Sequence, residues 1–343
     1  MKEKVLFLLN AILSWVWKNP NKCNSNAIRD ILIIKWDEIG DMVATLHVFN
    51  MLQQKFPKAK ITVVCKPFVS SLLTNNPNIY QIITDLNKIP TRNVDLWIEL
   101  RGTFKTFFKS ILSFPKYRVD RGSIRFKQRG NQPHEVETNY NIIKPLVNPI
   151  INFHGEIYLT TEDNRRVEEL VRNFGVEKFV VCHPGGRSLL RRWRTLNFAE
   201  VVDYIWDKYR LKTVLLGTSD ESEILHEINN LTKDKSIIWE TKESLKVLYG
   251  VLKKSNLFLG NESGPLQFAD LAKIPTLGLF GPGVERVFYP RNSQSSVIHH
   301  ILPCNPCDQV NCKQPHDWCM DRIKISEVQK NIDFLLRDYL IVK

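Results

Sequence analysis

Long hydrophobic runs, nucleotide-binding glycine fingerprints and a dense set of cysteines are all missing from this sequence. No stretch reaches the roughly 18 to 20 apolar residues that a membrane-spanning helix needs. Neither a GxGxxG nor a GxxxxGK[ST] pattern occurs in the 343 residues. Their absence counts against a dinucleotide-dependent oxidoreductase. The chain has 7 cysteines, too few and too unevenly placed for a secreted disulfide scaffold of this length.

Acidic residues are in the minority. The sequence has 48 Lys and Arg against 36 Asp and Glu, a net charge of +12, which favours an anionic partner such as a nucleotide, a nucleic acid or an acidic lipid surface. Much of the excess lies between residues 101 and 129, where a single acid, Asp120, is surrounded by Arg101, Lys105, Lys109, Lys116, Arg118, Arg121, Arg125, Lys127 and Arg129. A solvated surface explains this cluster equally well. No nucleic-acid-binding module is present, so we expect no nucleic-acid partner.

The N-terminal segment, residues 1–28, needs a separate explanation. Residues 5–17 are mostly apolar, end in an aromatic pair and are flanked by lysines on both sides. This pattern is typical of an amphipathic helix that lies on a membrane surface. A helix docked on the protein's own core and a secretory signal are the alternatives, but no small-residue cleavage pattern follows the apolar run.

The rest of the chain reads as strands alternating with helices. Buried strands are expected at residues 31–35, 61–65, 79–84 and 96–100, and again at 179–183, 213–217, 236–239, 257–260 and 276–280. Three- and four-residue apolar spacing predicts helices at 42–56, 196–209, 221–231, 245–252 and 263–273. This alternation predicts mostly parallel, doubly wound sheets.

Because the pattern restarts after residue 150, we expect two Rossmann-like domains. The predicted organisation is an N-terminal segment at 1–28, a first domain at 29–150, a second at 151–325 and a C-terminal helix at 326–343. Ligands of open parallel sheets bind at the carboxyl ends of the strands. The loops that follow strands are therefore the candidate sites.

The loop after the first strand carries Gly40 and Asp41. The glycine permits a tight turn from strand to helix. Asp41 then falls in the first helical turn, where the helix dipole keeps a carboxylate ionised at neutral pH and ready to accept a proton. The simpler interpretation of this acid is a helix cap or a partner of the dipole.

Two loops in the second half are candidates for binding phosphate. The loop after residues 179–183 combines a Gly-Gly turn, whose exposed amides suit an anion, with a fan of arginines: Gly185, Gly186, Arg187, Arg191 and Arg192. A solvent-exposed basic turn is the alternative. The loop after residues 257–260 contains Glu262, Ser263 and Gly264. Ser263 can cap the following helix, Gly264 allows close approach of a ligand, and Glu262 can accept hydrogen bonds from sugar hydroxyls or act as a cap.

Five segments, in order along the chain, resemble those of one known family. They are the strand, Gly-Asp and helix of residues 31–56; His134-Glu-Val-Glu137; His183-Pro-Gly-Gly leading to Arg192-Trp193; Gly260-Asn-Glu-Ser-Gly-Pro; and Leu279-Phe-Gly-Pro282. Together they resemble glycosyltransferase family 9, the heptosyltransferase-like family. The resemblance covers residues 30–325 and implies a GT-B fold with the site in the cleft between two Rossmann-like domains.

The resemblance also implies roles for individual residues. Asp41 would be the base that takes the proton of the acceptor hydroxyl, and Gly40, Arg121, Arg125, His134 and Glu137 would bind the acceptor. Arg191 would meet the donor diphosphate with the help of Gly185, Gly186, Arg187, Arg192, Glu262, Ser263 and Gly264. Glu262 stands where the family usually has Asp, Gln267 where many members have His, and Arg194 where they have Pro. These departures leave the identity of the sugar and the nucleotide open.

Four cysteines near the end of the second domain form a separate motif. Cys304, Cys307, Cys312 and Cys319 supply four soft ligands within a short segment, which is typical of a structural zinc or iron–sulfur site. Disulfides or free thiols are the alternative. In either case we expect the motif to staple a loop and to take no part in the chemistry.

The resemblance implies a specific activity. It is transfer of heptose or a related sugar, with inversion and without a metal or cofactor, from a nucleotide-diphosphate sugar to an anionic glycan or glycolipid such as lipopolysaccharide. We expect the enzyme at the cytoplasmic face of the inner membrane. A catalytically silent nucleotide or glycan binder on the same fold is the alternative.

Overall fold

The computed structural model describes residues 17–90, 92–122, 132–147, 153, 155–314 and 316–337. The predicted membrane-binding helix and Arg125 lie outside these residues. The chain divides into two compact units, Met1–Tyr158 and Leu159–Lys343. The division falls slightly beyond the predicted boundary at residue 150. Each unit is described by itself below.

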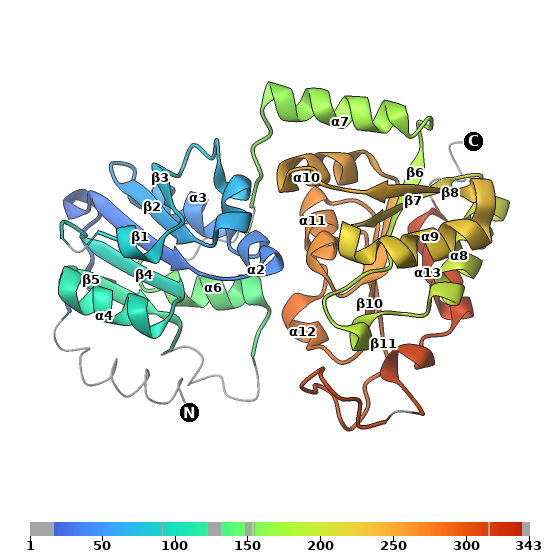
Figure 1. Ribbon diagram of the computed structural model, residues 1–343. Coiled ribbons are helices and arrows are strands. Elements are labelled where there is room, and N and C mark those ends of the chain that lie inside the picture. Colours follow the sequence, from blue (N-terminus) through green and yellow to red (C-terminus); the bar gives the residue numbers. More distant parts are fainter. Residues whose placement is uncertain are drawn as a thin grey trace. The chain divides into compact units, whose positions relative to one another are not determined.

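The N-terminal unit is built on one parallel five-stranded sheet (Figure 1). Its order is β3-β2-β1-β4-β5, with strands β1 (Asp30–Lys35), β2 (Lys60–Cys65), β3 (Gln81–Ile83), β4 (Leu96–Arg101) and β5 (Tyr117–Asp120). The helices are α2 (Ile39–Val43), α3 (Leu46–Lys55), α4 (Phe104–Ser113) and α6 (Glu135–Ile143). One buried cluster packs strand residues Leu32, Ile34, Val64 and Trp97 together, which places β1 at the centre of the sheet and its carboxyl end at the candidate site.

The C-terminal unit contains a parallel six-stranded sheet of order β11-β10-β9-β6-β7-β8. Its strands are β6 (Phe179–His183), β7 (Lys212–Gly217), β8 (Ser236–Glu240), β9 (Leu257–Asn261), β10 (Thr276–Phe280) and β11 (Ser295–His299). Its helices are α7 (Thr161–Asn173), α8 (Thr195–Tyr209), α9 (Ser222–Thr232), α10 (Leu245–Lys254), α11 (Gly264–Ala272), α12 (Glu285–Phe288) and α13 (Ile325–Leu335). Every residue of β6, β9 and β10 is buried, as expected for central parallel strands covered on both faces.

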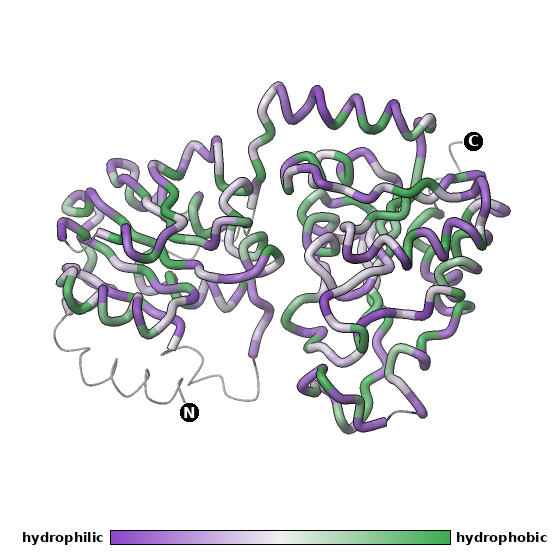
Figure 2. Tube along the Cα trace, viewed as in Figure 1, coloured by the Kyte–Doolittle hydropathy of each residue, from purple (hydrophilic) through white to green (hydrophobic). Residues whose placement is uncertain are grey.

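Hydropathy follows this architecture. Figure 2 shows largely hydrophobic central strands, whereas α7 is mostly hydrophilic and buries only Val167 and Leu170. Helix α13 contributes Val328 and Ile332 to the core of the C-terminal unit. Among the described residues, no helix is both long and apolar enough to cross a bilayer.

Several elements differ from the sequence prediction, among them helices α4, α6, α7 and α12, which were not predicted. The helix expected at 42–56 is broken between α2 and α3, where Thr45 Oγ1 donates to Asp41 O at 2.8 Å and Asn139 Nδ2 donates to Ala44 O at 3.2 Å. Side chains thus bind the carbonyls at the break. Strands β5 and β11 were not predicted because β5 carries charged residues and β11 buries only Ile298. Both are edge strands, where apolar patterning is weak.

Candidate active site

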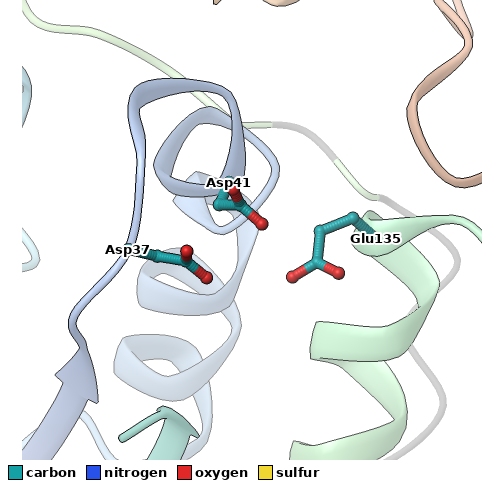
Figure 3. Close-up of side chains that lie close together, drawn as sticks. All are labelled: Asp37, Asp41 and Glu135. Atoms are coloured by element: carbon teal, nitrogen blue, oxygen red, sulfur yellow. The ribbon is translucent and has the colours of Figure 1, made fainter. Parts of the chain in front are cut away.

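Three carboxylates meet at the carboxyl end of β1. Asp37 follows the strand, Asp41 lies in α2 and Glu135 is the first residue of α6, and their carboxylate oxygens lie within 4.8 Å of one another. Figure 3 shows the three side chains pointing toward one another from these separate segments. Like charges so close disfavour full ionisation unless cations lie beside them.

Two buried cations neutralise most of this charge. Lys35 Nζ lies 3.0 Å from Glu135 Oε1 and 3.5 Å from Asp37 Oδ2. Arg121 donates from Nη1 to Glu135 Oε1 at 2.5 Å and from Nη2 to Glu135 Oε2 at 2.7 Å. The trio has the spacing of a cation site, yet Lys35 and Arg121 already supply the positive charge. A third, partly exposed cation, Arg101, has its Nε 3.8 Å from Asp37 Oδ2, so three cations face the three carboxylates.

The pKa values separate the roles of these carboxyls. Burial raises the pKa of Asp41 to about 6, with Lys35 opposing and Asp37 and Glu135 reinforcing the shift. Burial would also raise the pKa of Glu135, but the charges and hydrogen bonds of Lys35 and Arg121 outweigh it and hold this pKa well below its usual range. Asp41 is therefore the carboxyl that takes up a proton near neutral pH, which suits a general base.

The environment of Asp41 differs from the prediction in two respects. Gly40 has helical backbone inside α2 and does not form a left-handed turn. The dipole of the short helix α2 does not lower the pKa of Asp41, because desolvation outweighs it, but a pKa of about 6 still leaves this carboxyl mostly ionised at neutral pH.

The predicted acceptor residues lie around the same cluster. His134 is the N-cap of α6 and accepts a hydrogen bond from Val136 N at 3.2 Å, while Glu137 is half-buried in the first turn of that helix. Arg121 is buried with Glu135, so it does not belong to a surface patch. Arg118 is likewise buried, bound to Glu99 at 2.7 Å and to Asp120 at 3.0 Å. The basic stretch at 101–129 is thus partly internal.

In the C-terminal unit, Asn261 connects two loops that follow strands. This fully buried residue ends β9 and donates to Pro184 O at 2.8 Å and Gly185 O at 3.0 Å. Its Oδ1 accepts from Trp193 N at 3.1 Å. One amide side chain therefore fixes the course of the Gly-Gly loop beside β9.

Glu221 fastens the same loop from the other side. Its Oε1 accepts from Gly186 N at 2.9 Å, and its Oε2 accepts from Thr218 N at 3.1 Å and lies 3.4 Å from His183 Nε2. Burial would raise the pKa of Glu221, but hydrogen bonds and the His183 charge lower it to about 2. The prediction of exposed Gly-Gly amides is thus wrong at Gly186, whose N–H is already bound and whose backbone is buried.

Arg191 and Glu262 come together as the resemblance implies. Arg191 Nη1 lies 3.4 Å from Glu262 Oε1, and burial raises the pKa of Glu262 while Arg191 opposes the rise. A Cβ on Gly283 would collide with the Glu262 carboxylate, so the turn after β10 needs glycine there. Arg191 Nε also donates to Gln309 Oε1 at 2.5 Å.

The remaining predicted donor residues fall into two groups. Arg187 is exposed, and Arg192 donates from Nε to Gly186 O at 2.9 Å, so it stabilises the loop. Ser263 does not cap α11 with its side chain, contrary to the prediction; its Oγ instead lies 3.1 Å from His183 Nδ1. Gly264 begins α11.

The four clustered cysteines line one pocket of the C-terminal unit, together with Leu190, Pro282 and Trp318. All four are free thiols in the structure. Their donor set fits a soft metal, but within the described residues no three of these sulfurs lie within 4.8 Å of one another.

A parallel-sheet domain with a cluster of buried carboxylates and a second one with an arginine-bearing loop match the fold class of the two-domain GT-B glycosyltransferases. The model of glycosyltransferase family 9 (heptosyltransferase) matches residues 121–317. The chain belongs to this family and is a glycosyltransferase.

Relatives over most of the chain agree with this assignment. A Haemophilus influenzae protein described in general terms as a glycosyltransferase is 26% identical over 81% of this chain and 87% of its own. Lipopolysaccharide heptosyltransferase 3 of Escherichia coli strain K12 is 22% identical over 78% of this chain and 89% of its own.

Solved structures share the fold. A family 9 glycosyltransferase from Veillonella parvula has a TM-score of 0.76 and 19% identity, covering 90% of this chain and 97% of its own. Escherichia coli heptosyltransferase WaaC with ADP has a TM-score of 0.65 and 14% identity, covering 89% and 99%. The iron-containing dodecameric glycosyltransferase TibC of enterotoxigenic Escherichia coli has a TM-score of 0.56 and 12% identity, covering 91% and 77%.

Several residues of these clusters were not predicted from the sequence: Lys35, Asp37, Glu135, Glu221, Asn261 and Gln309. A lysine at the end of an otherwise apolar strand was a usable signal for Lys35, because a buried lysine requires an acidic partner. Glu135 lies inside the His134-Glu-Val-Glu137 segment, but nothing in that pattern tells which of its two glutamates turns inward. Gln309 has no local signal at all.

Proposed function

We propose that this enzyme transfers heptose from an ADP-activated donor to a lipopolysaccharide or related envelope glycan, with inversion. The acceptor hydroxyl oxygen forms a bond to the anomeric carbon while the bond from that carbon to the diphosphate oxygen breaks. The hydroxyl proton passes to Asp41, and the nucleoside diphosphate leaves with the bonding electrons. The observation that carries the proposal is the Asp41 carboxyl, whose pKa of about 6 suits proton uptake at neutral pH.

Each cluster then supplies one part of the reaction. Burial and the charges of Asp37 and Glu135 raise the pKa of Asp41, Lys35 and Arg121 limit that rise, and the step as proposed uses no metal ion. Arg191 stabilises the negative charge that develops on the leaving diphosphate, since guanidinium is a strong partner of phosphate oxygens. Glu262, Ser263 and Gly264 bind the rest of the donor. Heptose and ADP come from the named relatives, WaaC with ADP and the lipopolysaccharide heptosyltransferases.

The test is release of ADP from ADP-heptose in the presence of a lipopolysaccharide core lacking the terminal heptose. Wild-type enzyme should form product of inverted anomeric configuration in the presence of EDTA. Asp41→Asn should bind ADP normally, as a thermal shift reports, and form no product. A wild-type protein that binds ADP but transfers nothing would instead be the silent binder.

We also propose that the enzyme binds the membrane surface from the cytoplasmic side through its N-terminal segment. The residues next to that segment support this: the Arg118 guanidinium lies 5.2 Å from the centre of the Trp17 ring. Phe108 and Leu112 of α4 and its C-cap residue Phe114 are exposed by 57%, 70% and 72%. Exposed apolar side chains beside lysines suit an anionic lipid surface. Sedimentation with anionic and with neutral vesicles tests this, and equal absence from both pellets would contradict it.

The cysteine motif is proposed as a structural metal site. The relative TibC is described as iron-containing, and four thiols lining one pocket are a suitable donor set. Metal analysis of protein purified without chelator should give one bound zinc or iron centre per chain. The double variant Cys304→Ser/Cys307→Ser should lose this metal. Asp41 is unchanged in that variant.

A further inference from the structure

Gln309 of the cysteine-rich loop is hydrogen-bonded to the donor-side arginine turn. Its side-chain Oε1 accepts from Arg191 Nε at 2.5 Å, and its backbone oxygen accepts from Ser188 Oγ at 3.1 Å. The two segments are 118 residues apart in sequence at Arg191. One residue of the loop thus holds both the start of the turn and the head group of its arginine.

The same loop is anchored on the turn that follows β10. Cys307 N donates to Pro282 O at 3.3 Å, and Asn305 Nδ2 donates to Gly281 O at 2.5 Å. Met320, just past the loop, packs so closely that a Cβ on Gly281 would collide with its sulfur. The loop therefore bridges two turns of the donor side, and Gln309 is positioned by these anchors.

The Arg191 guanidinium is held at two of its three nitrogens. Nε is bound to Gln309, and Nη1 lies 3.4 Å from Glu262 Oε1, while the side chain keeps 27% of its surface exposed. Among the described residues, Nη2 has no hydrogen-bond partner. A fixed guanidinium with one open edge is suited to a phosphate oxygen.

We propose that Gln309 is a positioning residue for Arg191 and that the cysteine-rich loop is in this way part of the donor site. A free arginine loses rotamer freedom when it binds a ligand, and an arginine that is already fixed loses less. A neutral amide orients the guanidinium without cancelling its charge, which a carboxylate at 309 would do. The inference rests on the proposed role of Arg191 with the donor diphosphate.

The experiment compares full-length variants by calorimetric titration. The ligands are ADP, GDP, UDP, CDP and dTDP; the tightest binder is then compared with its nucleoside, which has no phosphate. The variants are Arg191→Ala, Gln309→Met, the double variant, and Gln314→Met as a matched control from the same loop. Met keeps the length of Gln but removes its acceptor, and melting temperatures report folding.

Gln309→Met should weaken nucleoside diphosphate binding roughly 3- to 10-fold, the range expected for ordering one arginine side chain. Nucleoside binding, the melting temperature and the Gln314→Met control should stay at wild-type values. In turnover, KM for the donor should rise with kcat unchanged. The double variant should bind no more weakly than Arg191→Ala alone, because both changes remove the same contact.

Other results would overturn the inference. If Arg191→Ala loses diphosphate affinity and Gln309→Met does not, Gln309 has no positioning role while the proposed function stands. If Gln309→Met weakens the nucleoside equally, or adds to Arg191→Ala, the loop acts on the fold and not on Arg191. If no nucleoside diphosphate binds, or Arg191→Ala binds as wild type, the proposed donor role fails and this inference fails with it.

Discussion

The cluster around Asp41 and the cluster around Arg191 are held together in different ways. Around Asp41, buried charges are balanced within the N-terminal unit: Lys35 and Arg121 bind Glu135 at 3.0 and 2.5 Å. Around Arg191, a neutral amide, Asn261, and loop contacts organise the backbone, and the arginine stays partly exposed. The first arrangement raises the pKa of the Asp41 carboxyl, and the second leaves one edge of the Arg191 guanidinium open. Substitutions should therefore change stability and pH dependence in one cluster and donor affinity in the other.

The largest effect is expected at Asp41. Asp41→Asn should lower kcat by roughly 100- to 10,000-fold, the contribution of a general base. Because burial raises the pKa of this carboxyl to about 6, ionised Asp41 destabilises the fold at pH 7, and the variant should melt a few degrees higher. Steady-state kinetics and thermal melts measure both. A lower kcat together with a lower melting temperature would contradict the assignment of Asp41 as a base whose buried charge destabilises the fold.

Removing the Glu135 carboxylate from its ion pairs should chiefly lower the free energy of unfolding. Glu135→Gln leaves Lys35 and Arg121 with one carboxylate fewer, and loss of one partner of a buried pair costs about 3 to 5 kcal/mol. Chemical unfolding of the variant should show this loss. Glu162→Gln, which removes an exposed ion pair with Arg165, is the control and should change the unfolding free energy by less than about 1 kcal/mol. Equal losses of unfolding free energy in the two variants would mean that the buried ion pairs of Glu135 do not stabilise the fold.

The pH dependence should follow Asp41. At pH values below about 6 the carboxyl is protonated and cannot accept the hydroxyl proton, so kcat/KM should fall about tenfold per pH unit on the acid side. Above that pH the rate should reach a plateau. The affinity for ADP should not show the same tenfold fall per pH unit, since the proposed mechanism gives Asp41 no contact with the diphosphate. If ADP affinity falls at acid pH while kcat/KM does not, Asp41 is not the group that limits turnover.

The smallest effect is expected at Glu262. Glu262→Gln keeps the shape beside Gly283 but removes the carboxylate near Arg191, so KM for the donor should change by roughly 3- to 10-fold with kcat nearly constant. Glu285→Gln is the control: this half-buried carboxylate of α12 lies in the same unit, 3.8 Å from His299 Nδ1. A kcat loss as large as that of Asp41→Asn would show that Glu262 takes part in the chemical step.

Strands with apolar sequences were the most predictable part of the fold. β6 and β10 match their predicted bounds because every residue in them is buried, so composition alone marks them. β5 was missed because its charged residues are buried only through partners, as Arg118 is through Glu99. Local patterning does not report such pairings.

The candidate site also divides into residues that local sequence marks and residues that only distant contacts bring in. Asp41, Arg191 and Glu262 follow recognisable strand-to-helix loops, so the resemblance located them. Their partners do not follow from any local pattern: Glu135 lies 100 residues from Lys35, and Gln309 lies 118 residues from Arg191. Sequence spacing carries no information on contacts of that separation.

By itself, the sequence determined two parallel α/β domains, the family, and the loops that carry Asp41 and Arg191, because apolar periodicity and short glycine-rich turns are local properties. Only the tertiary structure decided that Asp41 is desolvated beside Lys35 and Glu135, that the Gly186 amide is already bound to Glu221, and that the cysteine-rich loop reaches Arg191. Burial and long-range hydrogen bonds set these properties, and both arise only when distant segments pack together.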